Sequence, residues 1–357
     1  MQDSKRNKPI TQAHQAQEAI DSGVITPPTP AAALAWAQAR GLTRLDAQVL
    51  LLHALGACRT LGVESENAPQ RDQFLPDSPP HSGAMGQEDG KKWAAAAHSQ
   101  PTIPKSDRLL GRPASDRAWL LAHDRDPLPA ACLAHFAALC QRRAAGEPVA
   151  YLTGVKEFYG LPLAIDARVL DPRPDTEVLV DWALEVLAGR AAPRVLDLGT
   201  GSGAIALALQ HQRPDAQVLA VDASADALAV AQANARRLAL PVQFMQSDWL
   251  EGVRGSFDLI VANPPYIAAD DPHLPTLRHE PSQALVSGAQ GLDDLRRIVA
   301  DAPRHLAPGG WLLLEHGWDQ AAAVRELLHA QGLVQVQSRR DLGSHERCSG
   351  AQKAARV

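Results

Sequence analysis

The stretch that decides the fold runs Arg194-Val195-Leu196-Asp197-Leu198-Gly199-Thr200-Gly201-Ser202-Gly203. Its first five residues have the apolar character of a buried strand, and a helical pattern begins at Ala204. Alternating glycines between a strand and a helix let the backbone turn sharply and approach a ligand, because no Cβ intervenes. Ligands of an open α/β sheet bind beyond the carboxyl ends of its strands. The stretch therefore predicts a ligand-binding loop in a parallel sheet.

The loop by itself fits two kinds of cofactor. Gly199, Gly201 and Ala204 satisfy the G-x-G-x-x-A fingerprint of dinucleotide-binding proteins. Asp222 ends the next predicted strand, where a carboxylate would hold ribose hydroxyls. Both an NAD-dependent oxidoreductase and a methyltransferase need that carboxylate, so these four residues do not separate the two classes.

Three further residues favour S-adenosylmethionine. Asp197, directly before the loop, can accept hydrogen bonds from the amino group of a methionine moiety, whereas it would sit awkwardly beside a pyrophosphate. After the third predicted strand, Asp248 offers an acceptor for an exocyclic amine, and Trp249 offers an aromatic face for adenine. We therefore expect S-adenosyl-L-methionine as the cofactor.

Strand and helix patterns alternate on both sides of this loop. Strands are predicted at 194–198, 217–222, 242–246, 257–262, 310–315 and 333–338. Helices are predicted at 175–188, 203–212, 224–239, 291–306 and 319–331. Such alternation predicts an α/β fold with a mostly parallel, doubly wound sheet, which is the Rossmann-like fold of class I S-adenosylmethionine-dependent methyltransferases.

The preceding part of the chain has a different organisation. Residues 1–30 are polar and end in a proline-rich run, so we expect a disordered tail. Residues 31–148 are expected to form a small helical bundle domain, with a flexible insertion at about 57–110. A β-hairpin linker at 149–171 then leads to the methyltransferase domain at 172–357.

Bulk composition is that of an ordinary globular protein. The chain has 357 residues, 45% hydrophobic and 21% charged, with a net charge of −5. Its four cysteines form no C-x-x-C pair, so we expect ordinary thiols and no metal site. Because no apolar signal region or membrane-length run occurs, we expect a cytoplasmic protein without membrane contact. Scattered Lys and Arg argue mildly against sequence-specific nucleic-acid binding.

A second motif, Asn263-Pro264-Pro265-Tyr266, follows the predicted strand 257–262. Two prolines at a strand end fix φ and leave their carbonyls as acceptors, while Asn263 adds a side-chain carbonyl and Tyr266 a flat apolar surface. Acceptors aimed at an NH₂ group stabilise the positive charge that the nitrogen gains during methyl transfer. The motif therefore predicts methylation of a planar amino group, without a metal.

These motifs assign the candidate site residues. The predicted catalytic residues are Asn263, Pro264 and Tyr266. The predicted substrate-binding residues are Asn263, Pro264, Pro265 and Tyr266. The predicted cofactor-binding residues are Asp197, Gly199, Thr200, Gly201, Ser202, Gly203, Asp222, Asp248, Trp249 and Asn263.

Taken together, the motifs resemble those of the bacterial release-factor glutamine methyltransferases. The similarity covers about 31–57 and continues from about 111 to the C-terminus. Besides the loop and the tetrapeptide, the matching segments are 146–154, 157–158, 172–177, 280–281, 284–285, 291–292, 314–317 and 341–343. In that family the helical domain helps to dock the protein substrate. The long tail and the insertion at about 57–110 depart from the family pattern, so the resemblance does not define the docking surface of this chain.

The resemblance implies a specific reaction. In that family the glycine loop, the acidic strand end and the Asp-Trp pair hold S-adenosylmethionine, and the tetrapeptide holds the glutamine of a Gly-Gly-Gln motif. It implies methylation of that glutamine's side-chain amide nitrogen in class-1 peptide chain release factors. A glutamine methyltransferase acting on a ribosomal protein, an adenine N6-methyltransferase acting on nucleic acid, an NAD-dependent oxidoreductase and a binding module without turnover stay as alternatives.

Overall fold

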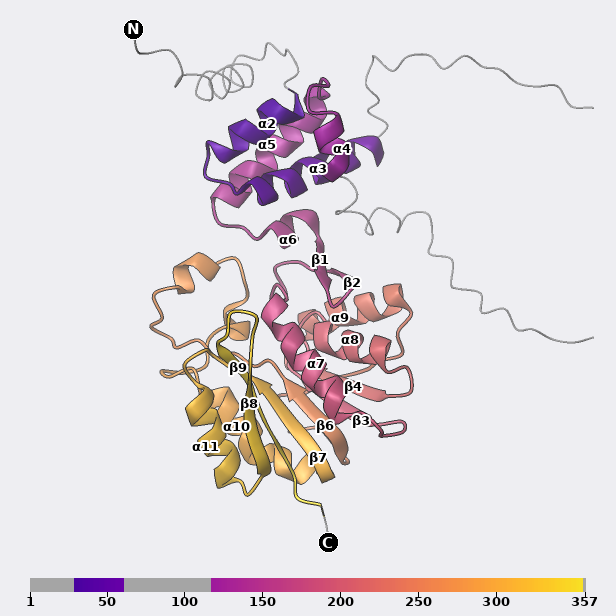
Figure 1. Cartoon of the computed structure of the whole chain (residues 1–357), viewed down its shortest axis with the longest axis vertical. Coiled ribbons are helices and arrows are strands. Elements are labelled where there is room, and N and C mark those ends of the chain that lie inside the picture. Colours follow the sequence, from indigo (N-terminus) through magenta and orange to yellow (C-terminus); the bar gives the residue numbers. More distant parts are fainter. Residues whose placement is uncertain (1–28, 61–116, 356–357) are drawn as a thin grey trace, which may run out of the picture. The chain divides into compact units, whose positions relative to one another are not determined.

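The computed structural model describes residues 29–60 and 117–355 (Figure 1). The chain divides into two compact units, of which the first ends at Ala138 and the second begins at Leu139. The predicted tail lies outside the described residues except for 29–30, and the predicted insertion does so except for 57–60. The predicted domain limits stay a prediction.

Within residues 29–60 and 117–138, the secondary-structure elements of the first unit are helices. They are α2 (Pro30–Gln38), α3 (Arg44–Thr60), α4 (Arg117–Ala122) and the first part of α5 (Ala130–Ala144). Helix α2 begins where a hydroxyl and a proline favour a start: Thr29 Oγ1 accepts from the Ala32 N–H, and Pro30 occupies the first turn. Trp36 and Phe136 are buried between the helices, with ring centroids 6.3 Å apart. This aromatic pair is the centre of the unit's core.

A disulfide joins Cys58 of α3 to Cys132 of α5. This finding corrects the expectation of ordinary thiols at these two positions. The cysteines lie 74 residues apart in the sequence, so no local spacing signals their pairing, whereas helix packing brings their Cα atoms to 5.8 Å. Cys140 and Cys348 are free and buried.

The second unit starts with a short helix and a hairpin. Helix α6 (Val149–Thr153) is followed by β1 (Val155–Phe158) and β2 (Leu161–Ala164), which pair antiparallel. The turn residues Tyr159 and Gly160 both have positive φ, 51° and 79°. Positive φ at both positions matches the right-handed twist of the strands, as in a type I′ hairpin turn.

A seven-stranded sheet forms the frame of the second unit. Its strands are β3 (Arg194–Leu198), β4 (Gln217–Asp222), β5 (Gln243–Gln246), β6 (Phe257–Ala262), β7 (Leu306–Glu315), β8 (Val334–Arg340) and β9 (Glu346–Gln352). Their spatial order is β5-β4-β3-β6-β7-β9-β8, and β9 runs in the direction opposite to the other six strands. The predicted mostly parallel, Rossmann-like sheet is confirmed.

Helices cover both faces of this sheet (Figure 1). On one face lie α7 (Glu177–Val186), α8 (Ala204–Gln212) and α9 (Ala225–Leu238); on the other lie α10 (Asp293–His305) and α11 (Ala321–Ala330). Successive residues of β6 alternate between the two cores: Leu259 packs in the first, and Ile260 packs in the second. A strand buried on both faces reads as a continuous apolar run, which explains the pattern at 257–262.

One feature of the topology places the site, and another adds a strand to the predicted sheet. The strand order reverses between β3 and β6, so the carboxyl ends of these strands flank a crevice. Strand β9, which sequence patterning did not predict, lies between β7 and β8. Three single-turn 3-10 helices, η2 (Pro174–Thr176), η3 (Leu274–Leu277) and η4 (Ser282–Ala284), lie in connecting segments.

Candidate functional site

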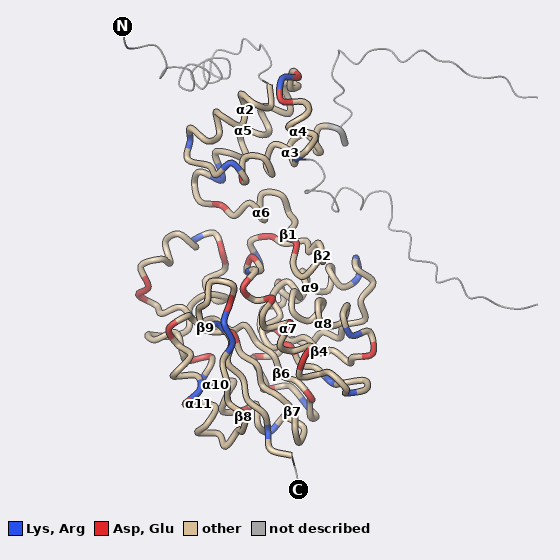
Figure 2. Tube along the Cα trace, in the orientation of Figure 1, with Lys and Arg blue, Asp and Glu red and all other residues tan. Residues whose placement is uncertain are grey.

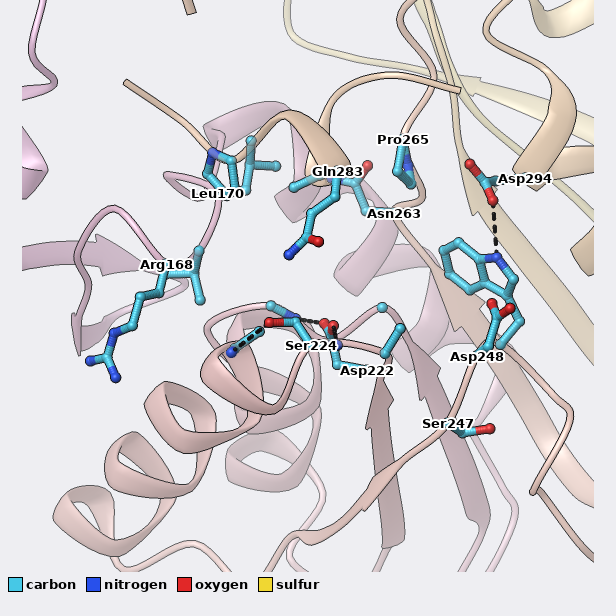
Figure 3. Close-up of a pocket in the computed structure, with 18 of the residues that line it drawn as sticks. Arg168, Leu170, Asp222, Ser224, Ser247, Asp248, Asn263, Pro265, Gln283 and Asp294 are labelled. Atoms are coloured by element: carbon cyan, nitrogen blue, oxygen red, sulfur yellow. Dashed lines mark hydrogen bonds between the residues drawn. The ribbon is translucent and has the colours of Figure 1, made fainter. Parts of the chain in front are cut away.

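A cavity opens at the carboxyl ends of the parallel strands (Figure 3). It encloses about 900 Å³, a volume that includes the open solvent at its mouth. The residues that line it come from segment 168–170, the loop after β3, the end of β4 with the start of α9, the segment after β5, the turn after β6, segment 281–284 and α10. They include Gly199, Gly201, Asp222, Ser247, Asp248, Trp249, Asn263, Pro265, Gln283, Asp294 and Arg297.

The glycine loop turns with three left-handed residues. Gly199, Gly201 and Gly203 have φ of 68°, 55° and 86°, which side-chain-bearing residues rarely adopt. A Cβ on Gly203 would lie 3.0 Å from Leu207, and one on Gly199 would lie 3.0 Å from the Trp249 ring. A Cβ on Gly201 would meet nothing within 4 Å, because this residue faces the cavity.

Asp197 lies beneath the loop and does not line the cavity. Its Oδ2 accepts from the Thr200 hydroxyl at 2.6 Å and from the Ala206 N–H at 3.2 Å. The carboxyl is fully buried, and burial raises its pKa to about 7. Its Oδ1 has no hydrogen-bond partner among the described residues. Thr200, Ser202 and Gly203, also predicted to bind cofactor, are likewise absent from the lining and shape the turn.

Asp222 ends β4 and lines the cavity. Its Oδ2 accepts from the Gly201 N–H, and its Oδ1 accepts from the Ser224 N–H, each at 2.9 Å. These two bonds fix the carboxylate against the glycine loop (Figure 3). Burial raises its pKa, and the two backbone donors oppose that rise. The position predicted from the strand end is the position observed.

The Trp249 ring lies next to Gly199 of the glycine loop. It is held by a carboxylate that the sequence motifs do not include. Its indole N–H donates to Asp294 Oδ1 at 3.0 Å (Figure 3). Asp294 Oδ2 in turn accepts from the Ser287 hydroxyl at 2.7 Å. Trp249 itself has a φ of 48°, an uncommon backbone state for an aromatic residue. Asp248, beside it, pairs with Arg297 at 2.8 Å. Only the helical pattern of α10 could have signalled Asp294 and Arg297.

The tetrapeptide lies between this cavity and a smaller one. The second cavity encloses about 430 Å³ including its mouth and is lined by Leu170, Arg173, Asn263, Pro264, Tyr266, Ile267, Leu277, Ala284 and Leu285. Leu170, Asn263 and Ala284 line both cavities. The structure therefore brings Asn263 to the junction, with Pro265 on the large side and Pro264 and Tyr266 on the small side.

Polar contacts behind the tetrapeptide link it to other elements. Asn263 Nδ2 donates to Thr176 Oγ1 at 3.2 Å, and the Tyr266 hydroxyl donates to Glu315 Oε1 at 3.4 Å. Burial raises the pKa of Tyr266 and raises that of Glu315 to about 7. Thr176 and Glu315 lie in two segments that resemble the family, 172–177 and 314–317, but the sequence motifs assign them no role.

A charged network borders the small cavity. Arg173 Nη2 donates to Glu280 Oε1 at 2.5 Å, and Glu280 Oε2 accepts from the Asp171 N–H at 3.2 Å. Asp171 also pairs with Lys156 at 3.2 Å. These two cations and two carboxylates balance in charge, so the network adds no net charge to the apolar wall of the small cavity.

Comparison with known proteins identifies the family. Residues 176–279 match the model of the methyltransferase small domain, and residues 114–154 match that of the PrmC N-terminal domain. A release factor glutamine methyltransferase of Bordetella pertussis is 54% identical over 71% of this chain and 96% of its own length. One of Xylella fastidiosa is 52% identical over 71% and 94%. The chain belongs to the release factor glutamine methyltransferase family.

One of the solved structures that are similar to this chain is also named as a glutamine methyltransferase. It is a protein-(glutamine-N5) methyltransferase (release factor-specific) from Alicyclobacillus acidocaldarius, with 31% identity, 51% coverage of this chain and 94% of that chain. Its TM-score is 0.34, so the family assignment rests on the sequence relatives. In residues 29–60 and 117–355, no helix has the length and apolar character to cross a membrane, and no cluster of His, Cys, Asp or Glu suits a metal ion.

The residues present fit the cofactor of this family, S-adenosylmethionine. The glycine loop leaves backbone space at Gly201 that a Cβ would fill, and Asp222 faces that space with a fixed carboxylate. Trp249 supplies a flat aromatic wall, and Asp248 lies next to it. Carboxylates and an aromatic face beside an open stretch of backbone suit an adenosine-bearing methyl donor.

Proposed function

We propose that this chain transfers a methyl group from S-adenosylmethionine to the side-chain amide nitrogen of the glutamine in the Gly-Gly-Gln motif of class-1 peptide chain release factors. The observation that carries the proposal is the position of Asn263, which lines both cavities. A group bound in the small cavity therefore meets a group bound in the large one at this residue. We also propose that the protein acts in the cytoplasm, where translation termination takes place.

The large cavity is proposed to hold the methyl donor. Asp222 would accept from the ribose hydroxyls, Trp249 would pack on the adenine, and Asp248 would accept from its exocyclic amine. Asp197 would act from below: its bond to the Thr200 hydroxyl holds the loop in shape, and its buried Oδ1 has no hydrogen-bond partner among the described residues. When bound, S-adenosylmethionine supplies a methyl group on a positively charged sulfur.

The small cavity is proposed to hold the glutamine side chain. Its wall is largely apolar, with Leu170, Ile267 and Leu285 suited to the methylene groups, and Asn263 and Pro264, which also line it, would provide the accepting oxygens. The balanced charges around Arg173 suit a neutral amide better than a carboxylate, because an uncompensated cation would favour glutamate.

The chemical step follows from this arrangement. The amide nitrogen forms a bond to the methyl carbon while the sulfur–carbon bond breaks and its electron pair returns to sulfur. The nitrogen becomes positive during this step, and oxygens of Asn263 and Pro264 that accept from its two hydrogens stabilise that charge more than they stabilise the resting amide. The nitrogen then releases one proton to water, which leaves a neutral N-methyl amide.

The distribution of charge supports a protein substrate over nucleic acid. In the described part of the chain, Figure 2 shows Lys and Arg residues interspersed with Asp and Glu along the backbone of both units. Proteins that bind a phosphate backbone gain most of their affinity from clustered Lys and Arg. An adenine N6-methyltransferase on nucleic acid is therefore the less supported reading of the same tetrapeptide.

The test is mass spectrometry of a release factor incubated with this protein and S-adenosylmethionine. We expect a gain of one methyl group on the glutamine of the Gly-Gly-Gln motif. Asn263→Ala should lower turnover by roughly 100-fold, as the loss of one transition-state hydrogen bond does elsewhere, while cofactor affinity in calorimetry stays near that of the wild type.

A matched control is Gln335→Ala, which removes an exposed amide on β8. It should leave both turnover and affinity unchanged. An unmodified release factor, with cofactor binding intact, would contradict the proposed substrate, and a ribosomal protein and then nucleic acid would be tested in its place. Parallel loss of turnover and cofactor affinity in Asn263→Ala would contradict the role given to Asn263.

A further inference from the structure

Two buried polar residues lie behind Asn263, and neither lines a cavity. Thr176 ends the 3-10 turn η2 and precedes α7, and Glu315 ends β7. Their exposed fractions are 4% and 1%. Asn263 Nδ2 donates to Thr176 Oγ1 at 3.2 Å, and the Thr176 side chain, as a hydrogen-bond donor, lowers the pKa of the Glu315 carboxyl. Three elements distant in the sequence thus meet in one chain of hydrogen bonds.

The direction of these bonds follows from the groups involved. An ionised carboxylate only accepts, so the single proton of the Thr176 hydroxyl points to Glu315. The Thr176 hydroxyl oxygen can then only accept a hydrogen bond from Asn263. The donor to it must therefore be the side-chain NH₂ of Asn263. The opposite end of the amide, Oδ1, is left as the free end of Asn263. The Tyr266 hydroxyl also donates to Glu315, which keeps the carboxylate in its accepting role.

An ordinary structural role does not account for this arrangement. Thr176 stands at the N-cap of α7, yet its side chain makes no capping hydrogen bond. Glu315 is a fully buried carboxyl whose Oε2 has no partner among the described residues, and burying such a group costs stability. Groups that neither cap a helix nor stabilise the core are expected where a particular polarity is needed.

We infer that Thr176 and Glu315 are positioning residues that hold the Asn263 amide with Oδ1, not Nδ2, toward the acceptor nitrogen. Shape alone cannot make this choice, because the O and NH₂ ends of an amide are nearly equal in size. With the amide reversed, an NH₂ group would face the substrate's NH₂ group, and the acceptor that stabilises the transition state would be lost. The inference rests on the proposed function of Asn263.

The experiment compares Thr176→Val with Thr176→Ser in the full-length protein at pH 8, where Glu315 is ionised. Valine keeps the branched shape but removes the hydroxyl, and serine keeps the hydroxyl. We expect kcat of Thr176→Val on a release factor to fall ~10- to 100-fold, the range reached when a transition-state hydrogen bond is lost or misdirected. Affinity for S-adenosylmethionine, measured by calorimetry, should stay at the wild-type value. Thr176→Ser should recover most of the lost kcat.

Each other outcome overturns the inference. Wild-type kcat in Thr176→Val would show that the hydroxyl does not orient Asn263. An equal loss in the serine variant, or a parallel loss of cofactor affinity, would show that the side chain only supports the fold. These results differ from failure of the proposed function itself, in which the wild-type protein would bind the cofactor but leave the release factor unmodified.

Discussion

Burial sets the charge state of two carboxyl groups close to the site. The pKa values of Asp197 and Glu315 are both raised to about 7, because each group is removed from water and neither has enough donors to compensate. Hydroxyl donors, from Thr200 to Asp197 and from Thr176 to Glu315, oppose the rise. Both carboxyls therefore change protonation near neutral pH, which links protein stability to pH.

Glu315→Gln should make stability less sensitive to pH. A glutamate titrates at pH 4.5 in the unfolded chain and at about 7 in this fold, so the native state holds the extra proton between these values. Wild-type stability therefore falls as pH rises through this window and stays lower above it. The variant has no such loss, and its free energy of unfolding relative to wild type should rise by up to ~3 kcal/mol between pH 4.5 and pH 8.

Urea unfolding of both proteins at the two pH values measures this difference. Asp197 is present in wild type and variant, so its contribution cancels. Glu326→Gln, which neutralises an exposed carboxylate on α11, serves as the control and should show no such dependence. A constant difference between Glu315→Gln and wild type at both pH values would mean that Glu315 is not buried as described.

At the scale of elements, local patterns predicted those strands whose burial is visible in their own residues. Strands β3, β4 and β6 have the limits predicted, because each is a short apolar run bounded by polar or glycine residues. Strand β9 has the sequence Glu-Arg-Cys-Ser-Gly-Ala-Gln, which carries neither alternation nor an apolar run. Its central residues are buried only because β7 and β8 lie on either side of it.

The same distinction separates the parts of the site. The glycine loop and the tetrapeptide are each a run of adjacent residues, and the residue types in each run indicate its chemistry. Both were therefore predicted from the sequence. Asp294, Thr176 and Glu315 act through contacts with residues 45 to 87 positions away, and no spacing rule connects them. Asp197 was predicted as a ligand contact, but sequence position alone does not reveal that its side chain points beneath the loop.

The small residues of β9 lead to a prediction about packing. A Cβ added to Gly350 would lie 2.5 Å from Leu313 Cδ2 and 2.8 Å from both the Leu312 carbonyl and the Trp182 ring. Gly350→Ala should therefore destabilise the fold by ~1–3 kcal/mol, the usual cost of overpacking a well-filled core. Thermal unfolding followed by circular dichroism would measure it.

Gly252→Ala is the matched control for this change. The nearest atom to a Cβ there is Ser247 Oγ at 3.5 Å, an ordinary contact, so its melting temperature should stay close to that of wild type. If Gly350→Ala melted with the control, β9 would have room to shift away from β7, and its place in the sheet would be less constrained than the pairing with Leu313 indicates.

At the scale of the whole molecule, the two compact units have different roles under the proposed function. Every described residue that lines either cavity lies after Leu139, so the second unit contains both the proposed cofactor site and the proposed acceptor site. Residues 29–60 and 117–138 of the helical unit contribute no lining residue. Its role under the proposed function is to bind the release factor away from the glutamine, which adds affinity without changing the chemistry.

Hydrogen exchange can separate these contributions. S-adenosylhomocysteine, the demethylated product, should slow exchange of amides in the glycine loop and in the segments that follow β4, β5 and β6, because a ligand that binds only the folded site stabilises it by mass action. Amides of α2, α3 and α4 should exchange at unchanged rates, since none of these helices touches either cavity.

Adding a release factor to this complex should then protect amides of the helical unit as well. Protection limited to the second unit would contradict the docking role of the helices and leave recognition to the surface around the small cavity. Protection of α2 and α3 by S-adenosylhomocysteine alone would mean instead that the two units are coupled through the fold. In that case occupancy of the cofactor site would itself prepare the helices for the protein substrate.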